Sequence, residues 1–230
     1  MVNRIFSIFK KDYLEIKKNN YLFLTACMPI LFSILIYFNV GEDASDIELF
    51  LTLCGTYVFS IILVLASTIV EEKEYKTLEA LIMSPASFIE ILVGKSIVPI
   101  LIGVFNYFMG CYFLLDLDLH SDITELVLLI LMIVFSVLLG ILIGLVSKNI
   151  TQVNLLFIPV FVFVTLPVLY DQLFKYNEWL YAIRYLPSAQ QYALFINDTN
   201  LFLSISLIVL WSVLVTVLNY YFYRRVIINK

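Results

Sequence analysis

Few residues in this sequence of 230 could carry out chemistry. Glu71 and Glu72 are adjacent carboxylates, of a kind that can activate water beside a bound metal. A metal site of that type also needs histidine ligands, and His120 is the one histidine in the sequence. The pattern therefore argues against metal chemistry, and no catalytic, cofactor-binding or metal-binding residue is predicted in the chain.

Gly94, Lys95 and Ser96 match the end of a phosphate-binding loop, in which backbone amides and a lysine hold nucleotide phosphates. The full motif also needs a glycine at position 89, and that position is Ile89, with no predicted strand before it. The match is therefore interpreted as accidental. We expect the chain to bind no ATP of its own.

Composition places the chain in a membrane. Apolar residues make up 62% of the sequence and charged residues 14%, with a mean hydropathy of +0.99. A soluble domain of this size needs more polar residues to cover its surface. Soluble enzymes and nucleic-acid-binding proteins are thereby excluded, and the expected surroundings are membrane lipid.

Six apolar runs contain no Asp, Glu, Lys or Arg, and each is a candidate spanning helix. A helix rises 1.5 Å per residue, so about 20 residues cross a hydrocarbon core of about 30 Å. The predicted fold is an all-α polytopic membrane protein, one transmembrane domain over residues 1–230. Cysteines inside the runs are expected to be free packing residues, namely Cys27, Cys54 and Cys111. The predicted spans are 21–40, 49–70, 97–115, 126–146, 155–170 and 201–222.

The basic residues predict the orientation. If the N-terminus is inside, 12 of the 14 Lys and Arg residues lie in the inner segments 1–20, 71–96, 147–154 and 223–230. The outer loops then hold 11 of the 18 acidic residues. Positive residues favour the cytoplasmic side, so both termini are predicted to be cytoplasmic, in a multi-pass protein of the cell (plasma or inner) membrane.

The N-terminal segment 1–20 is predicted to be an amphipathic interfacial helix. Ile5, Phe9, Tyr13 and Ile16 recur at helical spacing, and lysines flank or oppose this stripe. A basic amphipathic helix of this kind lies in the membrane interface with its apolar face in the lipid. Two interpretations stay open: a simple anchor, and a helix that also contacts a cytoplasmic partner.

The inner loop 71–96 predicts a helix, a break and a second helix. Leu78, Leu81 and Ile82 share one helical face, and Pro85 ends that short helix. Ser87 and Glu90 have the spacing of a capping box, which starts the helix leading into the third span. An exposed apolar tip rimmed by charge indicates a docking site, and the alternative is a hairpin on lipid headgroups.

The order of residues in this loop resembles the corresponding loop of type-2 ABC transporter permeases. The matching segments are Glu72-Lys73-Glu74, Thr77-Leu78-Glu79-Ala80-Leu81, Ser84-Pro85, Glu90-Ile91-Leu92 and Gly94-Lys95. The resemblance covers about 24 residues as a motif and the whole chain in layout. Lys76 departs from the pattern, because the family usually has glycine before Thr-Leu-Glu.

The resemblance implies a permease half, with no catalytic site of its own. Such a half pairs with an identical copy or a related subunit around a translocation path, and its loop helix sits in a groove of a separate ATPase subunit. ATP and Mg²⁺ are then bound by that partner. The residues that the resemblance assigns to ATPase coupling are Glu72, Glu74, Thr77, Leu78, Glu79, Leu81, Ile82, Ser84 and Pro85.

Other features concern the spans and the outer side. Gly140 and Gly144 are expected to pack against a neighbouring helix, either of the same chain or of a second half. The outer segment 171–199 is rich in aromatic residues and corresponds, by the resemblance, to a re-entrant hairpin. Four polar residues are interpreted either as cavity-lining or as ordinary interhelical hydrogen-bond partners: Asn106, Gln152, Asn154 and Thr165.

Two other classes of protein are alternatives. A secondary transporter or channel usually keeps an ionisable residue within its spans, and these spans have none. A membrane-embedded enzyme is the other alternative, since Glu71-Glu72 and Lys76 are similar to the paired-glutamate motif of proteases that process prenylated proteins. That motif lacks its two histidines here. Uncharged spans favour an amphipathic or lipophilic cargo (a peptide, a lipid-linked molecule or a drug), and the resemblance favours export.

Overall fold

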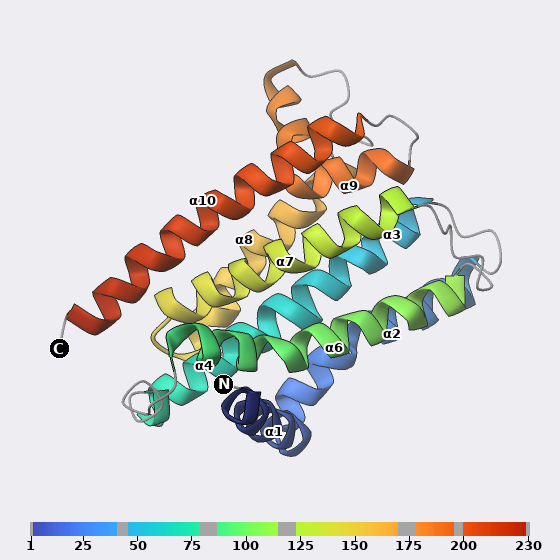
Figure 1. Cartoon of the computed structure of the whole chain (residues 1–230). Helices are drawn as coiled ribbons and strands as arrows, with labels where there is room; N and C mark the ends of the chain where they lie inside the picture. The colour runs from blue at the N-terminus through green and yellow to red at the C-terminus, as the bar shows by residue number, and fades with distance from the viewer. Residues whose placement is uncertain are drawn as a thin grey trace.

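The computed structural model describes residues 2–40, 46–78, 87–114, 123–169, 178–195 and 200–228. Six of its helices are long and apolar enough to cross a membrane, which confirms the predicted all-α membrane fold. These helices run as a bundle, with both termini toward the same end (Figure 1). They are Asn20–Asn39, Ile47–Glu74, Ile89–Leu114, Leu126–Val146, Ile150–Val168 and Leu201–Arg224.

Several helices extend beyond the apolar runs that predicted them. The third span belongs to α6 (Phe88–Leu114), which begins at the capping box, and the last belongs to α10 (Leu201–Ile228). The first, fourth and fifth spans belong to α2 (Asn20–Val40), α7 (Ile123–Val146) and α8 (Ile150–Leu169). Helical hydrogen bonding continues past the last apolar residue, because the charged ends of a helix can lie outside the hydrocarbon.

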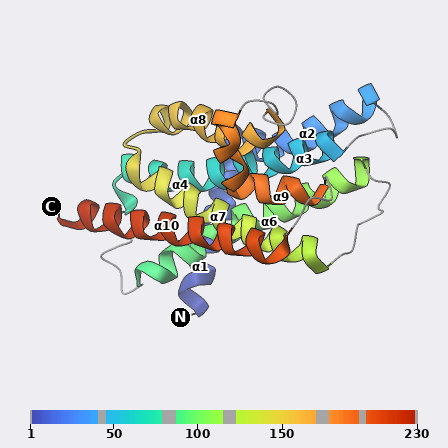
Figure 2. The same ribbon diagram turned by 90° about the horizontal axis from the view of Figure 1, so that it is seen from above.

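The second span is the centre of the bundle. It consists of α3 (Asp46–Gly55), the π-helix η2 (Thr56–Leu63) and α4 (Val64–Glu74) in direct succession. Within its most apolar stretch 89% of the residues are buried, compared with 17% for the last span. Segments η2 and α4 together contact α2, α6, α7 and α8. The other spans are therefore arranged around this one, as the view from above shows (Figure 2).

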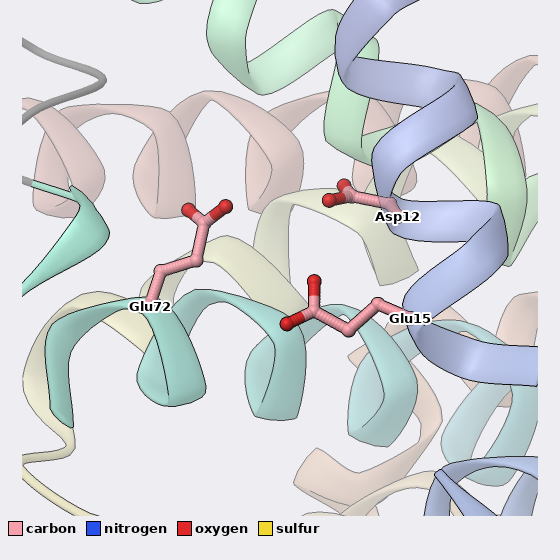
Figure 3. A group of neighbouring side chains, drawn as sticks. All are labelled: Asp12, Glu15 and Glu72. Atoms are coloured by element: carbon pink, nitrogen blue, oxygen red, sulfur yellow. The ribbon is translucent and has the colours of Figure 1, made fainter. Parts of the chain in front are cut away.

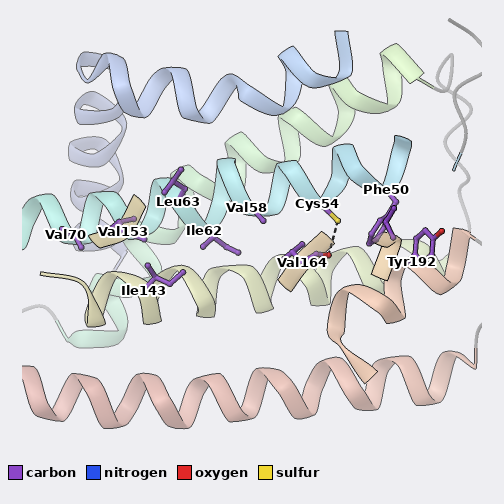
Figure 4. Close-up of a cluster of buried hydrophobic side chains, with 12 residues drawn as sticks. Phe50, Cys54, Val58, Ile62, Leu63, Val70, Ile143, Val153, Val164 and Tyr192 are labelled. Carbon is purple, nitrogen blue, oxygen red and sulfur yellow. Dashed lines mark hydrogen bonds between the residues drawn. The ribbon is translucent and has the colours of Figure 1, made fainter. Parts of the chain in front are cut away.

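A cluster of buried apolar side chains fixes the second span against α7, α8 and the outer helix α9 (Pro187–Phe195). In Figure 4, Phe50 lies beside Tyr192 at one end of this cluster, and their ring centroids are 4.9 Å apart. The Cys54 thiol lies 3.6 Å from the Val164 carbonyl oxygen. All three cysteines are free, as predicted.

Glycines allow α7 to approach the second span closely. A Cβ atom at Gly140 would lie 3.2 Å from the Ile62 carbonyl oxygen, and one at Gly144 would lie 2.9 Å from the Ile69 Cβ atom. Small residues at such positions let helix backbones pack tightly in a membrane. The glycine pair therefore packs within the chain, the first of the two predicted arrangements.

The end of the bundle away from α1 carries two short helices, η4 (Glu178–Tyr185) and α9 (Figure 1). Two buried glutamines tie α9 to the spans. Gln191 donates to the Tyr57 hydroxyl at 2.7 Å, and Gln190 accepts a hydrogen bond from Ser204 at 2.9 Å. These contacts fix the described part of the predicted outer hairpin to η2 and α10.

Helix α1 (Val2–Lys18) crosses the other end of the bundle and packs against α6 and α2 (Figure 1). Its buried face consists of Ile8, Asp12 and Ile16, spaced four residues apart, whereas Tyr13 is exposed. The predicted lipid-facing stripe of Ile5, Phe9, Tyr13 and Ile16 stays a prediction, and of these four residues Ile16 belongs to the face buried against the spans. The buried face includes a carboxylate, which places a charge at the contact with the spans.

Candidate functional site: a charged junction at the base of the inner loop

The last residues of α4 form contacts with four other helices. We call Glu71, Glu72, Lys73 and Glu74 the loop-base junction, because the inner loop 71–96 begins with them. Glu71 and Glu72 are buried at the crossing with α1, Lys73 is half-buried and Glu74 is exposed.

Glu72 is the centre of a buried ion network. Its Oε2 atom is 2.9 Å from the Lys95 Nζ atom on α6, and Lys11 on α1 pairs with its other oxygen. The Lys95 Nζ atom is also 3.5 Å from both carboxylate oxygens of Asp12. The Glu72, Lys95 and Asp12 side chains are each only 1% exposed. Buried charges persist when they are paired, so this network joins α1, α4 and α6.

Three carboxylates of the network lie close together: Asp12, Glu15 and Glu72 have oxygens within 4.8 Å of one another (Figure 3). Three such groups could hold a cation, and the Lys95 ammonium already lies against two of them. Burial raises the pKa of Asp12 to about 6; the charge of Glu72 adds to this effect and Lys95 opposes it. The cluster is a network of ion pairs in which carboxylates outnumber ammonium groups.

Glu71 connects the junction to the start of the first span. Its carboxylate accepts a hydrogen bond from the Asn19 side-chain amide at 2.7 Å. The Asn19 Oδ1 atom in turn accepts from the backbone amides of Tyr21 and Leu22 at 3.1 and 3.4 Å. Asn19 therefore caps α2 at the point where the chain leaves α1.

Lys73 and Glu74 hold the turn between α7 and α8. The Lys73 ammonium donates to the carbonyl oxygens of Gly144, Leu145 and Ser147 at 2.6, 2.6 and 3.0 Å. Glu74 accepts from the backbone amide of Ile150, the first residue of α8, at 3.2 Å. Both charges match the helix dipoles that they face, a cation at a C-terminus and an anion at an N-terminus.

The chain turns sharply after the junction. Lys76 has a φ of 57°, in the left-handed region, at the position where the type-2 ABC pattern has glycine. Left-handed residues commonly end helices, and glycine adopts this conformation without the cost of a Cβ contact. Thr77 then donates to the Glu72 carbonyl oxygen at 3.3 Å, and Leu78 is buried. The chain therefore turns here with lysine in place of the glycine that the family usually has.

The predicted capping box is confirmed on the far side of the loop. The Ser87 amide donates to Glu90 at 2.7 Å, and the Glu90 amide donates to the Ser87 hydroxyl oxygen at 3.2 Å. Glu90 is also 3.6 Å from Arg4 on α1. Both ends of the inner loop are thus anchored to α1. The middle of the loop, including Glu79, Leu81, Ile82, Ser84 and Pro85, lies outside the described residues.

The family model for ABC-2 type transporters matches residues 3–196 of the chain. This match includes α1, the first five spans and the whole inner loop. The chain belongs to the ABC-2 type transporter family. A comparison with curated proteins finds no match. Family members are the membrane component of an ABC transporter, which associates with ABC ATPase subunits and is typically not catalytic itself.

Gly94 and Lys95 lie inside a continuous helix, α6, and not in a phosphate-binding loop. This position agrees with membership in the ABC-2 family. A Cβ atom at Gly94 would lie 2.9 Å from the Ile8 Cβ atom, so glycine permits the close contact of α6 with α1. Lys95 faces the ion network. Two of the three residues of this motif, Gly94 and Lys95, therefore have structural roles.

The four polar residues predicted either to line a cavity or to form interhelical hydrogen bonds all have hydrogen-bond partners within the chain. Asn106 donates to the Ala26 carbonyl oxygen at 2.6 Å and to the Ser60 hydroxyl at 2.5 Å, between three spans. The other three make contacts near α8: Tyr21 donates to Asn154 at 2.6 Å, Gln152 accepts from the Lys148 amide at 2.7 Å, and Thr165 donates to the Phe161 carbonyl oxygen at 2.9 Å. These contacts fit the interhelical and local hydrogen-bond interpretation. Cavity lining stays a prediction.

The sequence alone did not predict the roles of Asp12 and Lys95 in the ion network, or of Lys73 in the loop-base junction. One signal was present, because Asp12 lies midway between Ile8 and Ile16 at the four-residue spacing of a buried face. A carboxylate in that position needs a cation. Lys73 and Lys95 gave no comparable signal, since their partners are distant in sequence.

Proposed function

We propose that this chain is one permease half of an ABC exporter. A second half, identical or paralogous, completes the translocation path, and separate cytoplasmic ATPase subunits bind ATP and Mg²⁺. The observation that carries the proposal is the loop-base junction, which links the loop resembling the ATPase-coupling segment to α1, α6, α7 and α8. A segment joined in this way can pass a displacement to several helices together.

In this proposal, Thr77–Pro85 is the element that docks on the ATPase, with Leu81 and Ile82 at its apolar tip. Glu72 and Glu74 act differently. Glu72 is buried in the ion network and Glu74 binds the start of α8, so both contribute by holding the loop base rather than by touching the ATPase.

The proposed orientation places the loop-base junction and both termini in the cytoplasm, in the cell membrane. The split of 12 basic residues inside against 2 outside supports it. Single cysteines in a Cys-free background test the orientation by labelling intact cells with an impermeant reagent. Positions 46 and 184 should be labelled, and positions 73 and 148 should not; labelling at 73 or 148 contradicts the six-span orientation.

The proposed cargo is amphipathic or lipophilic, and the proposed direction is export. Support comes from spans that lack ionisable residues over their apolar stretches, as small ions and charged solutes usually require such groups. A peptide, a lipid-linked molecule and a drug share the required chemistry.

Native purification of the tagged chain in mild detergent, with its partners identified by mass, tests the proposal. We expect a soluble ABC ATPase. Leu81→Asp should prevent association, because an unpaired carboxylate buried in the groove costs several kcal/mol, and each 1.4 kcal/mol is about a factor of ten in affinity. Glu79→Ala is the matched control and should have a small effect, since an exposed charge contributes little. If Leu81→Asp retains the ATPase at wild-type yield with full transport, the loop is not the coupling element.

A further inference from the structure

The turn between α7 and α8, residues Ser147–Asn149, is attached to the inner loop although the two lie about 70 residues apart in sequence. Lys73 and Glu74, the last two residues of α4, make the attachment. The α4 and α7 ends and the start of α8 gather at one end of the bundle (Figure 1).

Lys73 contributes three hydrogen bonds to one helix end. An ammonium group has three donors, and here they reach two carbonyl oxygens in the last turn of α7 and that of Ser147 directly after it, at 2.6 to 3.0 Å. The last carbonyls of a helix have no partner within that helix. Lys73 therefore donates hydrogen bonds to carbonyl oxygens that have no partner within α7.

Glu74 makes the corresponding contact with α8. Its carboxylate accepts from the amide of Ile150, one of the first amides of that helix, which likewise lack an intrahelical partner. The turn is also braced internally. Asn149 accepts from the Gln152 amide at 2.9 Å, and the Gln152 side chain accepts from the Lys148 amide at 2.7 Å. Because the turn has its own hydrogen bonds and is also bound by Lys73 and Glu74, it can move as a unit together with the end of α4.

Helix packing reinforces the two polar contacts. Gly144, whose carbonyl accepts from Lys73, also lies directly against Ile69 one turn before the junction. The same part of α7 is thus held by apolar contact and by charge. The ends of α4 and α7 therefore have little freedom to separate while Lys73 remains in place.

We infer that Lys73 and Glu74 are positioning residues that make the α7–α8 turn move together with the base of the inner loop. The inference rests on the proposed function, in which the loop is displaced by an ATPase. It assigns α8 as a helix driven directly by that displacement, through its N-terminus, and not only through packing in the middle of the bundle.

The first experiment uses the permease alone, so its outcome does not depend on the ATPase. Amide hydrogen exchange at residues 148–152 is compared between wild type, Lys73→Met and Glu74→Ala. Loss of a charged hydrogen-bond partner should speed exchange in the turn roughly tenfold. Lys73→Arg and Glu74→Gln keep a donor or an acceptor and should restore most protection. Lys148→Met, at an exposed lysine of the same turn, should leave exchange unchanged. Equal exchange in wild type and both disruptive variants overturns the inference.

The second experiment uses the complex with the ATPase. Spin labels at Tyr75 and Thr151, both exposed, report the distance between the loop base and the start of α8 in a Cys-free background. In wild type this distance should be the same without nucleotide and after trapping with ATP and vanadate. In Lys73→Met it should differ between the two states while the ATPase stays bound.

Each outcome of the second experiment is decisive. A wild-type distance that changes on trapping, or a Lys73→Met distance that stays constant, overturns the inference. Loss of the ATPase from Lys73→Met alone would also overturn it, because the residue would then act in docking. If the wild-type chain binds no ATPase, the proposed function fails, while the exchange experiment still decides whether Lys73 and Glu74 hold the turn.

Discussion

Lys95→Met should destabilise the protein strongly, although the substitution keeps most of the side-chain volume. Lys95 lies 2.9 Å from a Glu72 oxygen and 3.5 Å from those of Asp12, and all three side chains are buried. At an effective dielectric constant of about 20, the two attractions are about 6 and 5 kcal/mol before desolvation. Desolvation of the ions offsets much of this gain.

The net loss is expected to be about 3–5 kcal/mol, the usual cost of removing one partner from a buried ion pair. The carboxylates of Asp12, Glu15 and Glu72 would then face one another, and the half-exposed Lys11 is the cation that still pairs with Glu72 among the described residues. For a chain of this size the loss corresponds to a fall of roughly 6–20 °C in the unfolding temperature. Thermal unfolding in detergent, followed by the loss of the monodisperse chromatographic peak, measures it at pH 7.5.

The triple variant Lys95→Met, Glu72→Gln, Asp12→Asn should recover most of the lost stability, because all three fully buried charges are removed and the half-exposed Lys11 can be solvated. Lys17→Met, at an exposed lysine of α1, is the control and should shift the unfolding temperature by less than about 2 °C. The reasoning is refuted if Lys95→Met behaves like Lys17→Met, or if the triple variant is no more stable than the single one.

Three further substitutions test other features. Lys76→Gly should raise the unfolding temperature by about 2–4 °C, since it removes a left-handed non-glycine residue worth about 1 kcal/mol, whereas Lys76→Ala should give no gain. Gly144→Ala should cost about 1–3 kcal/mol through its clash with Ile69, measured by the same assay. Gly55→Ala, where a Cβ atom meets nothing within 4 Å, is the matched control and should not destabilise. Asp12→Asn should change the pH profile of stability. The folded pKa of Asp12, about 6, lies above its unfolded value, so its contribution is largest below about pH 4 and declines as pH rises to about 6. The unfolding temperature of the wild type should therefore fall between about pH 4 and pH 6 relative to that of Asp12→Asn. If the unfolding temperatures of the two proteins change in parallel with pH, the raised pKa of Asp12 is wrong.

The sequence was sufficient to predict the spans and the helix start at Ser87, because these features depend on local composition and spacing. Long runs without charge can only be buried in lipid or protein, and the Ser87–Glu90 box acts over three residues. The ion network around Glu72 could not be predicted in the same way. Glu72, Lys95 and Asp12 belong to three helices, and only the packing of α1 on α6 brings them together.

The backbone details were also beyond sequence reasoning. Nothing in the composition of Thr56–Leu63 distinguishes a π-helix from the α-helix predicted there, since the segment is apolar either way. Lys76 shows the opposite case. The family usually has glycine at this position, and here a lysine adopts the positive φ, with the hydrogen bond from Thr77 to the Glu72 carbonyl oxygen closing the turn around it.

The unequal burial of the spans has a consequence for how such a sequence can diverge. Residues of the central second span face other parts of the same chain over 89% of its most apolar stretch, so most substitutions there alter internal packing. The last span is buried over only 17%, so its side chains face what lies outside the chain. Variation in α10 can therefore change the lipid or subunit that the protein accepts without changing its fold, and a deep mutational scan should find α10 tolerant and η2 and α4 intolerant.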